Sequence, residues 1–175
     1  MKKKKSVTTS YQMMDSPGDD SSNRSARPQL KKIAEEGGAR AAMAYLNSLG
    51  QSRFTALYRF DGDTLHNCVF FDRENPEATK SDDIPVMASY CVFVRDSKKK
   101  FTVTNAQYDE RVDGHPKQKT IQSYCGVPLM TIHGAMFGTV CHFDFAPGKI
   151  DKTAVDLLEY VASVLPDRPD GLSRF

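Results

Sequence analysis

The chain has 175 residues, of which 39% are hydrophobic and 26% are charged, and its formal net charge is +2. This length suits one domain with a core of ordinary size. No apolar run approaches the roughly 20 residues that cross a bilayer. No apolar segment follows the basic residues 2–5, so the sequence predicts no membrane span and no secretory signal. We therefore expect a cytoplasmic protein.

The charge is unevenly placed along the chain. Residues 1–28 hold six basic and three acidic residues, a net +3, which leaves −1 for the rest. A nearly neutral body disfavours a nucleic-acid surface, which needs clustered Lys and Arg. The four-lysine run could touch acidic lipid or RNA, but such runs are more often solvated tails. We expect a disordered polar tail over 1–28, one domain over 29–166 and a short C-terminal tail over 167–175.

Helical and β-strand spacing alternate through the predicted domain. Residues 30–49 have apolar positions at helical spacing, interrupted by Gly37 and Gly38, which predicts two helical pieces or a bent helix. Residues 54–60 and 65–71 follow as strands, and the Asp-Gly-Asp turn between them predicts a hairpin.

The middle of the chain is less regular. A loop is expected over residues 72–82, followed by a short helix with Asp83 as N-cap and Pro85 in its first turn. A short strand at residues 101–104 precedes a polar, loop-like stretch over residues 105–119, with one helical turn near His115.

The C-terminal part predicts a second hairpin and a helix. Its strands are expected at residues 123–130 and 137–145, and Pro128 indicates that part of the first strand lies at a sheet edge or that this strand ends early. Asp151 is the expected N-cap of the last helix, which Pro166 ends. Hairpins beside helices favour an α+β fold with an antiparallel sheet and helices on both faces. The terminal helices would cover one face, and residues 72–122 would enclose a cavity on the other.

Two motifs in the second hairpin resemble a known family. Residues 123–129 have the sequence SYCGVPL, and residues 137–144 have the sequence FGTVCHFD after Gly134. This order is similar to the GVPL…G…GTL signature of GAF domains. Residues 53–60, 89–91 and 105–111 resemble the family's earlier segments, so the likeness covers about residues 30–165.

The resemblance implies a sheet of about six antiparallel strands with helices on both faces and a pocket under the middle segments. Related domains bind cyclic nucleotides, bilins, haem or small metabolites, and many pair through their terminal helices. The ligand is left open here, as a nucleotide or another small metabolite. The candidate ligand-binding residues are Phe70, Tyr90, Cys91, Asn105, Asp109, Arg111, Tyr124 and His142.

Each candidate also has a structural interpretation. Asp109 and Arg111 could contact a polar ligand or form a loop ion pair of little energetic weight. Asn105 could bind a ligand or cap a turn. The aromatic candidates could equally be plain core. Cys141 and His142 are adjacent in a strand and should point to opposite faces, so we predict no metal site there.

The four cysteines are Cys68, Cys91, Cys125 and Cys141, and none lies in a C-x-x-C pair. The spacing therefore supports neither a zinc knuckle nor a dithiol motif. Some GAF proteins of this size reduce free methionine sulfoxide with a cysteine in the loop before the VPL strand. The matching residues 113–122 contain no cysteine, so this alternative would depend on Cys91 and Cys125. A covalent bilin is not expected, because Val92 replaces the histidine that would follow Cys91.

The favoured function is a small-molecule-binding sensor module without a fused output domain, signalling to a separate protein or through a homodimer. The last helix supports the dimer, because Ala154, Leu157 and Val164 lie outside its main apolar stripe, as do Met43 and Leu46 in the first helix. A thiol-dependent sulfoxide reductase is the second hypothesis, and a ligand-free dimerisation scaffold is the third. No nucleic-acid or membrane partner is expected.

Overall fold

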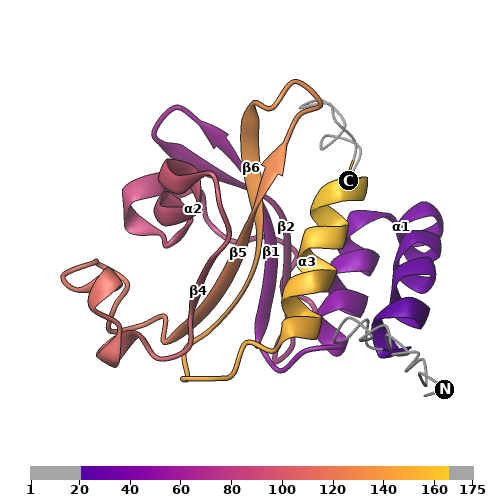
Figure 1. Ribbon diagram of the computed structural model, residues 1–175, viewed down its shortest axis with the longest axis horizontal. Helices are drawn as coiled ribbons and strands as arrows, with labels where there is room; N and C mark the ends of the chain where they lie inside the picture. The colour runs from indigo at the N-terminus through magenta and orange to yellow at the C-terminus, as the bar shows by residue number, and fades with distance from the viewer. Residues whose placement is uncertain (1–20, 166–175) are drawn as a thin grey trace, which may run out of the picture.

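The computed structural model describes residues 21–165 and contains one antiparallel six-stranded sheet between two helical layers (Figure 1). The strand order is β3-β2-β1-β6-β5-β4. The strands are β1 (Phe54–Asp61), β2 (Thr64–Asp72), β3 (Ile84–Pro85), β4 (Phe101–Val103), β5 (Ser123–Met130) and β6 (Met136–Asp144). The α-helices are α1 (Ser21–Ser48), α2 (Cys91–Ser97) and α3 (Lys152–Val164). Single 3-10 turns are η1 (Val86–Ala88), η2 (Ala106–Tyr108) and η3 (Glu110–Val112). The predicted α+β class and the antiparallel sheet are confirmed.

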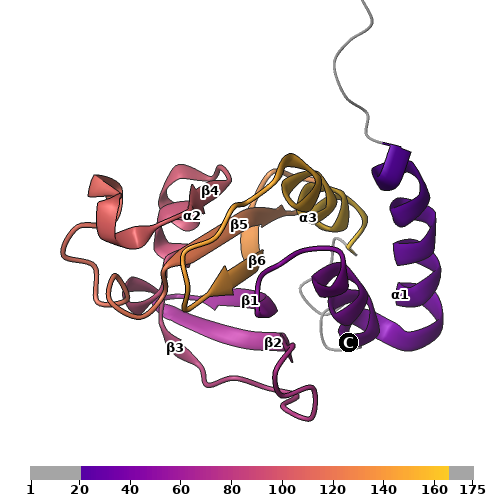
Figure 2. The same ribbon diagram turned by 90° about the horizontal axis from the view of Figure 1, so that it is seen from below.

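The two faces of the sheet bury different sets of side chains, because successive residues of a strand alternate between faces. The terminal helices α1 and α3 cover one face and pack on an aliphatic core that includes Leu57, Leu129 and Leu158 (Figure 2). The short helix α2 and the η turns cover the other face, whose core is rich in aromatic rings. The predicted separation of terminal and middle segments is therefore correct.

The first helix is longer than the sequence suggested. It bends at Gly38, whose φ of 75° is a left-handed conformation that glycine tolerates, so the predicted interruption is confirmed. However, α1 begins at Ser21, and Asn23 and Ala26 are only 2% and 5% exposed. The predicted tail boundary at residue 28 is therefore wrong for residues 21–28, which form the first turns of a packed helix. Residues 1–20 and 166–175, including the lysine run and the predicted C-terminal tail, lie outside the described residues.

The segment after β2 also differs from the expectation. Asp83 is not a helix cap, because its carboxylate bonds to the backbone N–H of Asn67 at 2.9 Å and to His66 Nδ1 at 2.7 Å. Pro85 pairs with Thr64 in strand β3. Helix α2 consequently starts only at Cys91. The polar stretch after β4 forms the 3-10 turns η2 and η3, and both lie N-terminal to the helical turn that was predicted near His115.

Two features of the C-terminal part agree with the sequence. Strand β4 pairs with residues 124–126 of β5 and stops before Pro128, so the proline lies where β5 has only β6 as a partner. Asp151 caps α3, and its carboxylate accepts a hydrogen bond from the N–H of Ala154 at 2.7 Å. Within residues 21–165, no helix combines the length and apolar character needed to cross a membrane.

Three of the side chains on which the dimer prediction depended are part of this chain's own core. Leu157, Met43 and Leu46 are each 1% exposed and pack in the aliphatic cluster under α1 and α3. The use of Leu157 as an interface residue is therefore wrong, whereas Val164 is 48% exposed, and the homodimer stays a prediction.

Candidate functional site

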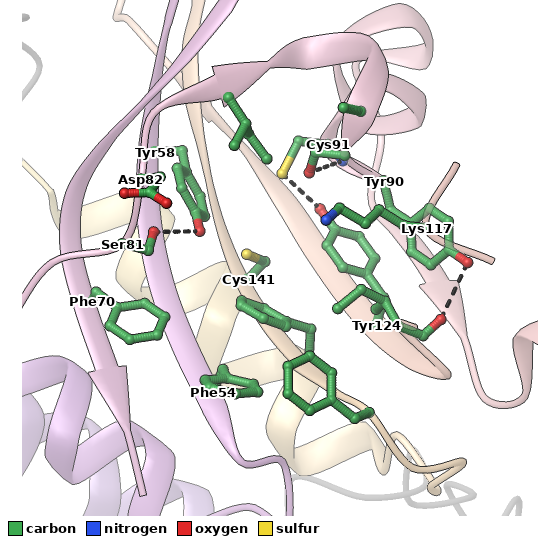
Figure 3. A pocket seen from close by; sticks show the side chains of 16 residues that line it. Phe54, Tyr58, Phe70, Ser81, Asp82, Tyr90, Cys91, Lys117, Tyr124 and Cys141 are labelled. Carbon is green, nitrogen blue, oxygen red and sulfur yellow. Dashed lines mark hydrogen bonds between the residues drawn. The ribbon is translucent and has the colours of Figure 1, made fainter. Parts of the chain in front are cut away.

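A cavity of about 400 Å³ lies between the sheet and the α2 side of the molecule (Figure 3). Strands β1, β2, β5 and β6 supply its floor, while the β2–α2 connection and the loop before β5 supply its sides. Aromatic rings make up much of the wall: Phe54, Tyr58, Phe70, Tyr90, Tyr124, Phe143 and Phe145. A space of this size admits a small metabolite rather than a macromolecule.

One end of the cavity is a cluster of phenylalanine rings. Phe54 lies at its centre, with ring centroids 4.7 Å from Phe143 and 5.7 Å from Phe70, both nearly parallel to it. Phe145 lies 4.9 Å from the same ring and is 52% exposed, which places it at the outer margin. Flat apolar groups would find stacking partners at this end.

Polar groups line the remaining wall. The Tyr58 hydroxyl and Ser81 Oγ are 3.1 Å apart, and the exposed carboxylate of Asp82 lies beside them. Lys117 and Ser89 complete the polar lining, and Figure 3 shows Lys117 across the cavity from Asp82. A few polar groups in an apolar cavity can orient a ligand that has both an apolar body and a polar group.

Two thiols lie at the base of the cavity, Cys91 at the start of α2 and Cys141 in β6. The Tyr124 hydroxyl donates a hydrogen bond to Cys91 Sγ at 3.3 Å. Burial alone would raise the pKa of Cys91, but hydrogen bonds from Cys141, Ser89 and Tyr124 outweigh it and lower that pKa. The same interaction with Cys91, together with burial, raises the pKa of Cys141. The two thiols therefore titrate as a pair, and the donors gathered around Cys91 favour its thiolate.

Gly126 explains how Tyr124 reaches this thiol. Both residues lie on the same face of β5, two positions apart. A Cβ atom at Gly126 would lie 2.1 Å from the Tyr124 hydroxyl oxygen, so the phenol ring occupies the space that any other residue would fill. The glycine of the GVPL motif therefore has a local role, because it lets the tyrosine lie along the strand.

Four of the predicted site residues line the cavity: Phe70, Tyr90, Cys91 and Tyr124. The candidates predicted from the sequence did not include Cys141, Phe54 or Phe143, which also line the cavity. Strand alternation already contained the signal, because Cys141 and Phe143 share one face of β6 and Phe54 pairs with Phe143.

Asn105, Asp109 and Arg111 lie elsewhere, around a separate shallow depression near η2 and η3. Asn105 Oδ1 accepts from Gln107 N at 3.2 Å, and Asp109 Oδ1 accepts from Arg111 N at 3.1 Å and from its Nε at 2.8 Å. These residues cap the two turns and form a loop ion pair, which matches their structural interpretation. The structure does not bring them to the cavity.

His142 is also absent from the cavity, so its assignment as a ligand-binding residue is corrected. It is 3% exposed and lies on the face that α1 and α3 cover, where its Nδ1 is 2.7 Å from Thr55 Oγ1. Burial lowers its pKa to about 4. Cys141 and His142 point to opposite faces, as strand alternation predicted.

Cys125 cannot be the partner of Cys91, because the two thiols lie on opposite faces of the sheet. Cys125 packs in the aliphatic core with α3, whereas Cys91 packs in the aromatic core. Burial raises the pKa of Cys125 to about 12, which makes it unreactive at neutral pH. The alternative in which Cys91 and Cys125 act together as a reductase pair is therefore excluded.

Comparison with solved structures identifies the fold. The GAF domain of an Acinetobacter phosphoenolpyruvate-protein phosphotransferase aligns with a TM-score of 0.68 at 12% identity, over 89% of this chain and 95% of that one. The free methionine-R-sulfoxide reductase of Neisseria meningitidis, solved with its substrate, gives 0.68 at 17% identity, over 94% and 99%. The chromophore-binding domain of a Stigmatella aurantiaca bacteriophytochrome gives 0.63 at 11% identity, over 82% and 58%. The chain therefore has a GAF-type fold, as its motifs predicted.

At these identities the likeness concerns the fold and not an activity, since one fold serves several functions. No protein-family model matches the sequence, and no curated protein matches it.

Proposed function

We propose that this GAF-fold chain is a sensor module that binds a small molecule in the cavity between the sheet and α2. The observation that supports this most directly is the cavity itself, about 400 Å³ in volume, with aromatic rings at one end and Ser81, Asp82 and Lys117 in its wall. A plain core would be close-packed at this position. The lining suits a metabolite with a flat apolar part and a polar or charged group.

Occupancy would act on the segments that form the cavity wall. Residues of the β2–α2 connection and of the loop before β5 both line it. A ligand that contacts both would favour one arrangement of these segments over others. The affected surface is the α2 side of the molecule, where a separate signalling protein could recognise it.

The experiment fills the cavity without changing the rest of the molecule. Ala88 lines the cavity, whereas Ala135 is exposed in the turn between β5 and β6. We expect native mass spectrometry of protein purified from its own cells to show a bound small molecule in the parent chain and in Ala135→Trp, but not in Ala88→Trp. Urea unfolding of all three proteins is the control that shows whether they are equally folded. A ligand that persists in Ala88→Trp, or none in the parent chain, would contradict the proposal.

A second candidate is thiol-dependent reduction of a sulfoxide in the same cavity. It is favoured by Cys91, a cavity-lining thiol with a lowered pKa, and by the likeness to structures of free methionine-R-sulfoxide reductases. Thioredoxin-coupled NADPH oxidation with free methionine sulfoxide tests it. Turnover that disappears in Cys91→Ala would make the chain an enzyme, and no turnover would leave the sensor as the better account.

A further inference from the structure

The thiols of Cys91 and Cys141 face the same cavity from two different elements. Cys91 begins α2, Cys141 lies in the centre of β6, and α2 packs directly on β6. Each thiol serves as a hydrogen-bond partner of the other. Both side chains are 1% exposed, so the cavity is the route by which a small reagent reaches them.

The surroundings distinguish the two sulfur atoms. Cys91 Sγ accepts a hydrogen bond from the Tyr124 hydroxyl at 3.3 Å and also interacts with the hydroxyl of Ser89. Donors around a sulfur stabilise its thiolate, which is the nucleophilic form. Cys141 keeps its proton, because its hydrogen bond with Cys91 and its burial raise its pKa. One thiol is thus prepared to attack, and its neighbour remains a thiol that can react second.

We propose that Cys91 and Cys141 form a redox-active pair that a hydroperoxide oxidises to an intramolecular disulfide inside the cavity. The Cys91 thiolate attacks the peroxide oxygen, the O–O bond breaks, and the leaving oxygen takes a proton to become water or an alcohol. Cys91 is then a sulfenic acid. The Cys141 sulfur attacks the Cys91 sulfur, its proton leaves with the hydroxyl as water, and a disulfide forms. An external dithiol returns both cysteines to thiols.

This reaction changes the cavity whether or not a ligand is present. The disulfide links the start of α2 to the centre of the sheet and removes the thiolate to which Tyr124 donates. The remaining cysteines are not competing partners. Cys125 lies on the other face of the sheet, and burial raises the pKa of Cys68, a half-buried residue of β2.

The test follows the four thiols of the reduced full-length chain during treatment with hydrogen peroxide. Samples are quenched with N-ethylmaleimide, and peptide mass spectrometry quantifies each cysteine. We expect Cys91 to react at least about tenfold faster than Cys68, although Cys68 is the most exposed thiol. Cys91 and Cys141 should disappear together into one linked peptide, and dithiothreitol should restore both.

Three variants sharpen the result. Cys141→Ala should accumulate a Cys91 sulfenic acid that dimedone traps, whereas Cys125→Ala and Cys68→Ala should form the same disulfide as the parent chain. Oxidation of Cys68 before Cys91, or a Cys141 that stays free while Cys91 is oxidised, would overturn the proposal. Because the parent chain alone decides this, a variant that fails to fold does not affect the conclusion. The result is independent of whether Ala88→Trp loses a ligand, so this proposal and the sensor proposal fail separately.

Discussion

The two faces of the sheet have the same backbone but opposite properties. The face under α1 and α3 has an aliphatic core, and two ionisable groups buried there are held neutral: burial lowers the pKa of His142 to about 4 and raises that of Cys125 to about 12. The face under α2 is aromatic and encloses the cavity, and hydrogen bonds overcome burial to lower the pKa of Cys91.

Neighbouring residues show how local this difference is. Cys125 pairs with His142 across β5 and β6, and Gly126 pairs with Cys141 in the next step of the ladder. Two adjacent positions of one strand therefore face different surroundings: His142 faces the aliphatic core, whereas Cys141 faces the cavity. Burial alone does not determine thiol chemistry here, since the hydrogen-bond donors around the sulfur decide it.

The largest expected effect concerns packing on the two faces. Leu158 is fully buried under α3, so Leu158→Ala removes its burial and leaves a void, at a cost of about 3–5 kcal/mol in unfolding free energy. Phe70 already borders the cavity, so Phe70→Ala should lose little beyond the transfer free energy of the ring, about 1.5–3 kcal/mol. Urea unfolding measures both. A larger loss for Phe70→Ala would mean that the aromatic face is packed as tightly as the other.

The second prediction uses pH to probe the face under α1 and α3. Asn47 Nδ2 donates to Thr55 Oγ1 at 2.9 Å, which leaves the Thr55 hydroxyl to donate to His142 Nδ1. The folded pKa of His142, about 4, lies below the 6.5 of an exposed histidine. The unfolded chain therefore binds the extra proton first, and stability falls as the pH drops from 6.5 to 4, by at most about 3 kcal/mol.

Urea unfolding at several pH values, compared with His142→Asn, isolates this contribution. The asparagine amide can take the place of Nδ1 but does not titrate, so the variant should lose less stability than the parent chain over this range. Equal pH dependence in the two proteins would show that His142 is not the responsible group.

The sequence predicted the elements whose signal is local. Period-two alternation located β1 and β2, Gly37 and Gly38 located the bend of α1, and Asp151 located the start of α3. The misplaced elements depend on partners distant in sequence. The Asp83 carboxylate has the chemistry of a helix cap, but it bonds to Asn67 of β2 instead, and no local pattern indicates that choice.

The candidate site was predicted only in part, for a similar reason. Tyr90, Cys91 and Tyr124 were found from the family resemblance, and they do line the cavity. Cys141 was not among the candidates, because its alternation with His142 was used only to argue against a metal site. The pairing of Cys91 with Cys125 failed because the face that α2 covers depends on tertiary packing.

The third prediction tests how far the aliphatic core extends along α1. Ala26 is buried, and the Arg27 guanidinium lies 5.5 Å from the centre of the Tyr160 ring on α3. A chain that begins at Gln29 should therefore be less stable than one that begins at Ser21, by about 1–2 kcal/mol. Thermal and urea unfolding of the two truncated chains decide this. Equal stability would restore the domain boundary that the sequence suggested at residue 28.

The smallest expected change concerns the hydroxyl that distinguishes the reactive face. Tyr124→Phe removes the donor to Cys91 Sγ, and Gly126→Ala places a methyl group where the Tyr124 hydroxyl lies. Both should raise the pKa of Cys91 and slow its alkylation by iodoacetamide about tenfold at neutral pH, with a smaller difference at high pH where the thiolate forms anyway. Gly50→Ala is the matched control, because an added Cβ there has no neighbour closer than 3.9 Å.

If Gly126→Ala slows the reaction and Tyr124→Phe does not, the glycine acts by shaping β5 rather than by admitting the tyrosine. If neither changes the pH profile, the remaining donors, Ser89 and Cys141, account for the low pKa of Cys91, and the GVPL glycine has no part in the chemistry of the cavity.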